Sequence, residues 1–208
     1  MRHLKMLGLA AMAAGVLVAI LGAGNASATV LCSTTVELCP EGQKWQANTV
    51  LDWTVPSGGS VNIVDTSGNS LDKCTTQTKK WKITVFGSGS QTVTGVEEAT
   101  TWESCTFTTK MLTLPKWEIH NIAGTSNGTV TSDGTAELTI NTGFFGSCIY
   151  GVSSGVSIGE ITEGAPAILH TNAVTSRFGT NFACPATAKL SGTLTLTTPV
   201  TTLSVASG

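Results

Sequence analysis

Two overlapping stretches of the chain match the motif around the nucleophile of many serine hydrolases. Residues 151–155 (GVSSG) and 155–159 (GVSIG) both read G-x-S-x-G, and Glu160 or Glu163 followed by His170 supplies an acid and a base in the expected order. The motif works on a sharp strand-to-helix turn of an α/β sheet, and here it lies in a Gly/Ser-rich stretch with no helical pattern after it. The acid and the histidine are also too close in sequence to come from separate strand ends. We therefore expect no catalytic role for these serines or for the histidine.

The other residues that bind metals or act as acids do not form a recognisable set. His120 lies on the polar side of a predicted strand, beside Glu118, and neither His120 nor His170 has the nearby cluster of carboxylates that a metal site needs. Residues 64–68 (VDTSG) partly match the Asp-Thr-Gly of aspartic proteases, but Ser67 interrupts the motif and no second copy follows. A turn in which Asp65 bonds nearby backbone is the simpler interpretation. We expect neither a metal nor a cofactor.

The densest basic cluster of the chain, K-K-W-K, lies on the first arm of a predicted hairpin. With its loop at residues 87–90, the register pairs Lys80 with Glu97 and Lys79 with Glu98 on the outer face, while the tryptophan points inward. Opposite charges across the strands then neutralise the lysines. The alternative is an anionic-ligand site with a stacking tryptophan, which the inward position of that ring disfavours.

The five tryptophans divide into two groups. Trp53, Trp81 and Trp117 alternate in step with aliphatic residues, so we expect them in the core. Trp45 and Trp102 are less constrained by such a pattern, and they are our candidates for ligand stacking.

Six cysteines predict three disulfides, because an even number in an exported chain is typical of a disulfide framework. A metal site would need close pairs such as C-x-x-C, and there are none. Loop closure and the predicted hairpin favour one set of pairs, with the last assigned by elimination. The expected bonds are Cys32–Cys39, Cys74–Cys105 and Cys148–Cys184.

The first 28 residues have the three-part layout of a secretory signal peptide. Basic residues at Arg2, His3 and Lys5 precede an apolar run at 6–21, and the small residues 26–28 (ASA) end the segment. The apolar run is shorter than the ~20 residues of a membrane span, which disfavours a retained anchor. We expect cleavage after residue 28, leaving residues 29–208 as a single secreted domain.

Composition excludes several classes of protein. Charged residues make up 12% of the chain, about half the usual share, and 35 threonines take much of their place. This disfavours a helical bundle, whose surface is rich in Glu, Lys and Arg. A net charge of −2 and 41% hydrophobic residues also disfavour a disordered chain or a nucleic-acid binder.

Bulky apolar residues alternate with threonine or charged residues in most of the mature chain. Trp53, Ile83, Ile119, Ile140 and Leu196 each belong to such a segment, and Gly-, Ser- and Asn-rich turns separate the segments. About ten to twelve short strands at this spacing predict an all-β fold, a single antiparallel β-sandwich or barrel.

Several short landmarks follow one another along the expected mature chain. A short loop closed by cysteines comes first, then a hairpin bracketed by two more, and a Thr-rich strand at residues 192–199 comes last. Between them lie residues 114–117 (LPKW), 148–150 (CIY) and 184–185 (CP). This order resembles that of a group of uncharacterised, secreted bacterial six-cysteine all-β proteins. The resemblance implies an exported, disulfide-stapled β fold, and it implies no activity, cofactor or catalytic residue.

The sequence therefore favours a secreted or cell-envelope protein that is not an enzyme and has a structural or binding role. The expected partner is a cell-wall or extracellular glycan or a protein, with no nucleic acid and no stable membrane insertion after cleavage of the signal peptide. The alternative is a small secreted hydrolase whose site is scattered over several loops.

Overall fold

The computed structural model describes residues 28–87, 91–143 and 146–208, and it is all-β as expected. Apart from a 3-10 turn, η1 (Glu41–Gln43), its regular structure consists of fourteen strands, slightly more than predicted. The strands are β1 (Thr29–Cys32), β2 (Val50–Thr54), β3 (Val61–Asp65), β4 (Ser70–Phe86), β5 (Val93–Cys105), β6 (Thr108–Thr113), β7 (Lys116–Asn121), β8 (Gly128–Ser132), β9 (Ala136–Asn141), β10 (Ser147–Val152), β11 (Ser157–Thr162), β12 (Ile168–Arg177), β13 (Thr187–Thr198) and β14 (Ser204–Ser207).

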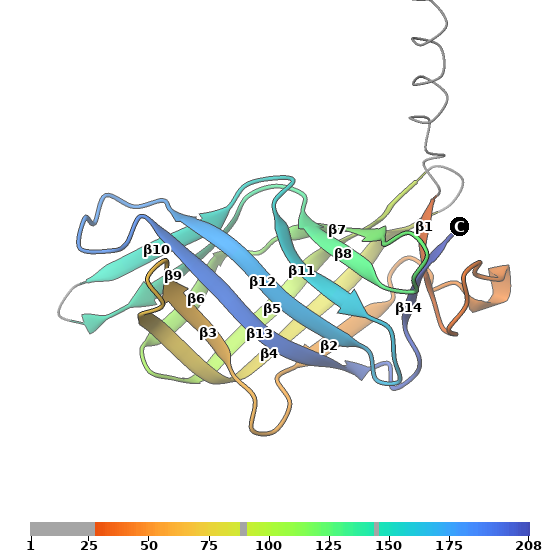
Figure 1. Ribbon diagram of the computed structural model, residues 1–208, viewed down its shortest axis with the longest axis horizontal. Coiled ribbons are helices and arrows are strands. Elements are labelled where there is room, and N and C mark those ends of the chain that lie inside the picture. Colours follow the sequence, from red (N-terminus) through yellow and green to blue (C-terminus); the bar gives the residue numbers. More distant parts are fainter. Residues whose placement is uncertain (1–27, 88–90, 144–145) are drawn as a thin grey trace, which may run out of the picture.

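The main sheet closes into an antiparallel barrel (Figure 1). Its wall runs from β4 through β5, β7, β8, β11 and β12 to β13. An eighth strand position, between β13 and β4, is shared by two short strands that follow each other along the barrel. β2 pairs with β4 at residues 78–82, and β3 pairs with it at residues 70–74. Closure settles the choice between sandwich and barrel that the sequence left open.

Alternation along the strands explains which residues fill the barrel. The predicted core tryptophans Trp53, Trp81 and Trp117 are at most 1% exposed, and their rings lie in contact. The ring centroid of Trp81 is 5.6 Å from that of Trp53 and 5.0 Å from that of Trp117. Threonines occupy many of the outward positions of the same strands. The alternation of apolar and polar residues in the sequence therefore corresponds to side chains that point alternately into and out of the barrel.

One part of the wall is extended by three further strands. The C-terminal end of β12 pairs with β10 at Arg177 and Tyr150, and β9 and β6 continue the sheet from there (Figure 1). These strands cover the half of the barrel that contains a second apolar cluster around Ile63, Ile140 and Tyr150.

The two ends of the described chain pair with each other at the opposite end of the barrel (Figure 1). Strands β1 and β14 form a two-stranded antiparallel ribbon in which Thr29 faces Ser207. Leu31 and Val205 from this ribbon belong to the main core cluster, so the ribbon packs against the barrel interior.

All three predicted disulfides are present, and together they use all six cysteines of the sequence. Cys32–Cys39 closes the loop after β1, and Cys74–Cys105 joins β4 to the end of β5. Cys148–Cys184 ties β10 to the segment before β13. The bonds therefore hold loops and strand ends rather than the middle of the barrel.

The predicted register of the β4–β5 hairpin is wrong. Phe86 pairs with Val93 rather than with Gln91, and two irregularities further along the ladder shift the register again, so Trp81 faces Glu97 and Lys80 faces Ala99. Residues 88–90 of the predicted loop lie outside the described residues. The shift moves Glu97 from the outer face to the interior, where it meets Lys79 rather than Lys80.

Close packing against Trp117 leaves no room for a side chain at Gly95. A Cβ atom at Gly95 would lie 2.1 Å from Cζ2 of Trp117 and 2.4 Å from the carbonyl oxygen of Lys82. We predict that Gly95→Ala lowers the free energy of unfolding by about 2 to 3 kcal/mol, because the tryptophan must move. Urea unfolding measures this, with Gly42→Ala as the control, since no atom lies within 4 Å of the added carbon there. Equal stability of the two variants would contradict the packing described.

Candidate ligand-binding site

A gap in the barrel wall separates β5 from β6. β5 pairs with β7 only at Val93–Val96, and β6 pairs on one side with β9, so no ladder joins residues 98–105 to β6 among the described residues. The gap is closed at one end by a hydrogen bond from the backbone N–H of Glu97 to the carbonyl oxygen of Pro115, at 2.9 Å. We call this gap, between residues 97–105 and 107–115, the lateral window.

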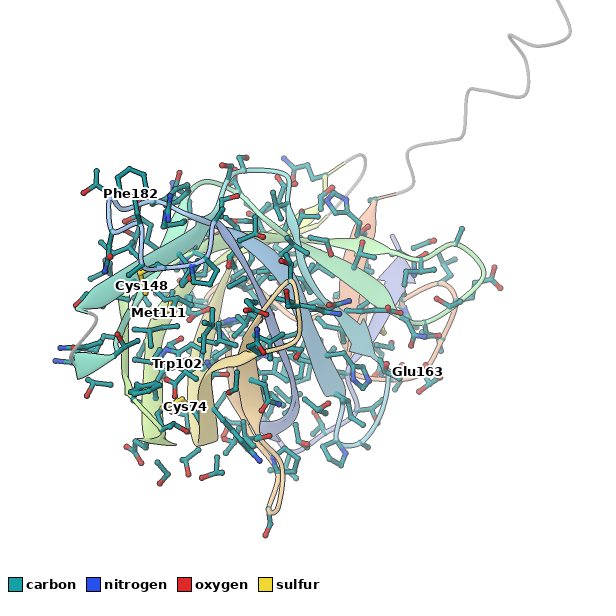
Figure 2. The ribbon with its side chains drawn as sticks, turned by 60° about the vertical axis from the view of Figure 1, so that its left-hand side comes forward. Cys74, Trp102, Met111, Cys148, Glu163 and Phe182 are labelled. Carbon is teal, nitrogen blue, oxygen red and sulfur yellow. A yellow bond between two sulfur atoms is a disulfide. The ribbon has the colours of Figure 1, made fainter. Side chains whose placement is uncertain are left out.

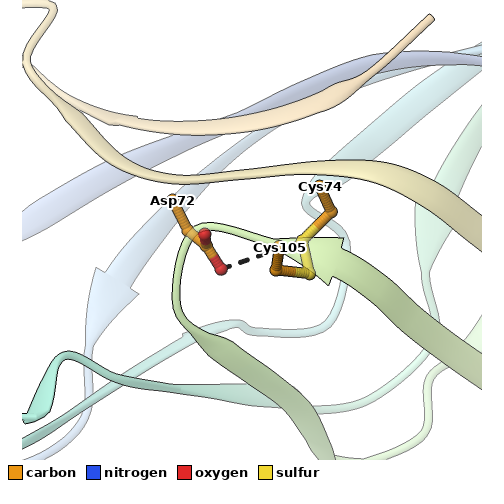
Figure 3. Close-up of side chains that lie close together, drawn as sticks. All are labelled: Asp72, Cys74 and Cys105. Carbon is orange, nitrogen blue, oxygen red and sulfur yellow. Dashed lines mark hydrogen bonds between the residues drawn. A yellow bond between two sulfur atoms is a disulfide. The ribbon is translucent and has the colours of Figure 1, made fainter.

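Asp72 closes the other end of the lateral window. Its buried carboxylate accepts hydrogen bonds from the backbone N–H of Phe107, at 3.0 Å, and from the hydroxyl of Thr109. The same carboxylate lies beside the Cys74–Cys105 disulfide, 3.8 Å from Sγ of Cys74 (Figure 3). Strand β4 therefore holds the start of β6 directly.

Asp72, Cys74 and Cys105 are residue types that bind metals, and their side chains lie within 4.8 Å of one another. Both sulfurs are bonded to each other, so neither offers the thiolate that a metal needs. The carboxylate is already occupied by the contacts to β6. The cluster therefore has a structural role: it links β4 to the end of β5 and to the start of β6 at the edge of the window.

The outer side of the lateral window is a hollow of about 810 Å³. Strands β5 and β6 and the turn between them line it, and Trp102 and Met111 are among its residues. Phe107, Leu112 and Leu114 add apolar side chains that are 38 to 52% exposed.

A separate cavity of about 60 Å³ lies on the inner side. Its lining is mostly apolar and includes Leu138, Leu169 and Ala173, together with Trp102 and Met111 again. Figure 2 shows Trp102 and Met111 near each other on this side of the molecule. These two side chains therefore separate the interior cavity from the outer hollow.

Lys79, which lines the cavity, belongs to a buried ion pair. The ammonium of Lys79 lies 3.2 and 3.3 Å from the two carboxylate oxygens of Glu97, and the indole N–H of Trp81 donates to the same carboxylate at 3.0 Å. The side chains of Lys79 and Glu97 are 9% and 0% exposed. Burying such a pair costs several kcal/mol per ion before the attraction between the charges is counted, so core stability alone does not explain it.

Tyr150 lines the cavity with its phenol side chain. Burial raises its pKa above the ordinary value of 10.0, an effect that the positive charge of Arg177 partly opposes and the negative charge of Asp65 adds to. Its hydroxyl donates to the carbonyl oxygen of Pro185 at 3.2 Å. Tyr150 is thus a neutral group whose hydrogen is already used.

The two candidate stacking tryptophans have different environments. Trp102 is half-buried in the lateral window and packs against both main apolar clusters. Trp45 is also half-buried, but it packs against the main core near β1, where its backbone N–H donates to the carbonyl of Leu31. Only Trp102 belongs to the window.

The hydrolase motif lies at the connection between β10 and β11, two strands that both pair with β12. Its first copy ends β10 and forms the turn into β11, so no strand-to-helix turn presents Ser153. Ser157 and His170 are exposed, the latter opposite Glu160 on the neighbouring strand. This geometry lacks the elbow that activates a serine in such enzymes.

The remaining polar candidates have local roles. The carboxylate of Asp65 accepts hydrogen bonds from the side chain of Asn69 and from the backbone N–H groups of Asn69 and Ser67. These bonds lower the pKa of Asp65 and confirm the predicted turn. His120 lies on the outer face of the barrel, with its Nε2 atom 3.4 Å from a carboxylate oxygen of Glu118.

Sequence reasoning missed Lys79 and Glu97 as interior residues, although a signal was present. Lys79 alternates in step with Trp81 and Ile83, which predicts an inward side chain. The assumed hairpin register overrode that signal. Met111 had no signal, because its position depends on which distant strand β6 pairs with.

Comparison with known proteins found no family model, no curated protein and no solved structure that matches this chain. In the part of the chain that the structure describes, no helix has the length and apolar character needed to cross a membrane.

The ion pair predicts an asymmetric response to mutation. Lys79→Met leaves the carboxylate of Glu97 buried without its cation, so we expect the free energy of unfolding to fall by about 3 to 5 kcal/mol. The double variant Lys79→Met/Glu97→Gln removes both charges and keeps an acceptor for Trp81, and it should recover most of that loss. Urea unfolding of the two variants tests this, and additive losses would contradict a buried pair.

Proposed function

We propose that this is an exported, non-enzymatic binding protein, secreted or held at the cell envelope, whose barrel takes up a small and largely apolar ligand through the lateral window. The observation that carries the proposal is that Trp102 and Met111 line both the outer hollow and the interior cavity. Displacing these two side chains joins the two spaces.

The dimensions support a small ligand. A barrel of eight strands has an interior just wide enough for side chains or for one small molecule. The cavity of about 60 Å³ is too small for more than a few atoms, and the hollow of about 810 Å³ beside it is within the range of small-molecule sites. The ligand therefore occupies the window and inserts an apolar part into the barrel.

The chemistry of the lining supports binding rather than catalysis. The hydroxyls of Thr171, Thr175 and Tyr150 each donate to a backbone carbonyl, and the ammonium of Lys79 is paired with Glu97. These polar groups are held in fixed contacts and are not poised to attack a substrate. The apolar lining of the interior cavity also favours a ligand with an apolar part over the glycan considered above.

A filled cavity should lose affinity for an apolar probe. Ala173 lines the cavity and is 2% exposed, whereas its neighbour Val174 points outward and is 62% exposed. We predict that Ala173→Leu weakens binding of N-phenyl-1-naphthylamine by about tenfold or more, because the added carbons occupy the space. Fluorescence titration measures the affinity.

The matched control is Val174→Leu, which enlarges a side chain on the same strand but on the outer face. It should bind the probe as the unaltered protein does. The same affinity in all three proteins, or no binding by any of them, would overturn the proposal.

Export is the second part of the proposal. It is supported by the basic, apolar and small-residue segments before residue 29, by the position of β1 directly after the expected cleavage site, and by the three disulfides. We predict that intact-mass analysis of the exported protein finds Thr29 at its N-terminus. Finding the full-length chain in the membrane fraction would contradict cleavage.

A further inference from the structure

The inner faces of β4 and β5 carry a continuous row of polar side chains beside the lateral window. Gln77 faces Trp102 across the two strands, and Trp81 faces Glu97. Between them, Lys79 faces Thr100. We call these six residues the polar ladder. It runs along one edge of the window through which the proposed ligand passes.

Half of the polar ladder has no hydrogen-bond partners within the described protein. Both side-chain amide atoms of Gln77, the hydroxyl of Thr100 and the indole N–H of Trp102 are buried and unpaired there. Gln77 is 0% exposed. Buried polar groups are nearly always hydrogen-bonded, because an unpaired one retains its full cost of desolvation.

The other half of the polar ladder is fully paired and has no net charge. Lys79 and Glu97 neutralise each other, and Trp81 bonds the carboxylate. An anionic ligand group would leave an uncompensated negative charge in this low-dielectric interior, which is strongly unfavourable. A neutral group avoids that cost.

The unpaired atoms match a group that both accepts and donates. The indole N–H of Trp102 and the amide N–H of Gln77 are donors, the amide oxygen of Gln77 is an acceptor, and the hydroxyl of Thr100 can be either. A carboxamide supplies the complementary oxygen and N–H on a single small group.

We infer that the ligand is a neutral molecule with an apolar body and a carboxamide-like end, and that Gln77 determines its specificity. This inference rests on the proposed function. Gln77 does not line the closed cavity, but it is the cross-strand neighbour of Trp102. The displacement of Trp102 that admits a ligand therefore also uncovers the amide of Gln77.

The test compares two ligands of one chain length. Octanamide and octanoate are titrated against the mature protein at pH 8 by displacement of N-phenyl-1-naphthylamine. Octanamide should bind about tenfold tighter or more, because the carboxylate adds an unpaired charge and lacks an N–H donor. Gln77→Met, which keeps the length of the side chain but removes its polar atoms, should lower this preference by about tenfold while the probe affinity stays unchanged.

If Gln77 served only to stabilise the fold, Gln77→Met would lower stability and keep the preference for octanamide. We expect the opposite. Removing two unpaired polar atoms should leave the urea midpoint of Gln77→Met equal to or above that of the unaltered protein. Lys80→Met, an exposed position on the same strand, is the control and should change neither binding nor stability.

The outcomes separate the two proposals. If neither the probe nor either octanoyl compound binds, the proposed function fails. If the probe binds but octanoate matches octanamide, or if Gln77→Met keeps the preference and lowers stability, the inference about the ligand fails while the proposed function stands.

Discussion

The long pairing of β4 with β5 is the interaction on which the rest of this structure depends. Strand β4 extends from Ser70 to Phe86, and its ladder with β5 runs from the Cys74–Cys105 pair to the Phe86–Val93 pair. On one side, β4 pairs with the two short strands that close the barrel. On the other side, only the first residues of β5, Val93–Val96, pair with β7. The same pairing therefore closes the barrel and leaves the lateral window open.

Two irregularities in this ladder decide what faces the interior. They occur between Lys80 and Trp81 and between Ile83 and Val85, and they displace β5 from a simple hairpin register. Since a shift of one residue exchanges the two faces of a strand, Glu97 moves into the barrel to meet Lys79. The charged pair is a product of that local geometry, whereas the Gln77–Trp102 and Lys79–Thr100 pairs keep the register of the Phe86–Val93 pair.

Sequence periodicity predicted the features that depend on neighbouring residues. The buried positions of Trp53, Trp81 and Trp117, the turn at Asp65 and the three disulfides followed from alternation, turn residues and spacing. Barrel closure and the partner of β6 depend on pairing between distant strands, which the sequence of one strand does not encode. For the site, Trp102 was named in advance, whereas Lys79, Glu97 and Met111 could be placed only once the register and the pairing were known.

The antiparallel ribbon of β1 and β14 has a consequence for how the molecule is oriented. Thr29 and Ser207 are cross-strand partners at the end of the barrel away from β6, β9 and β10 (Figure 1). A tether or fusion partner attached next to either of these residues is thus held at that end. A protein anchored in this way to a surface or a bead would present the half that contains the window outward, whichever of the two strands carries the anchor.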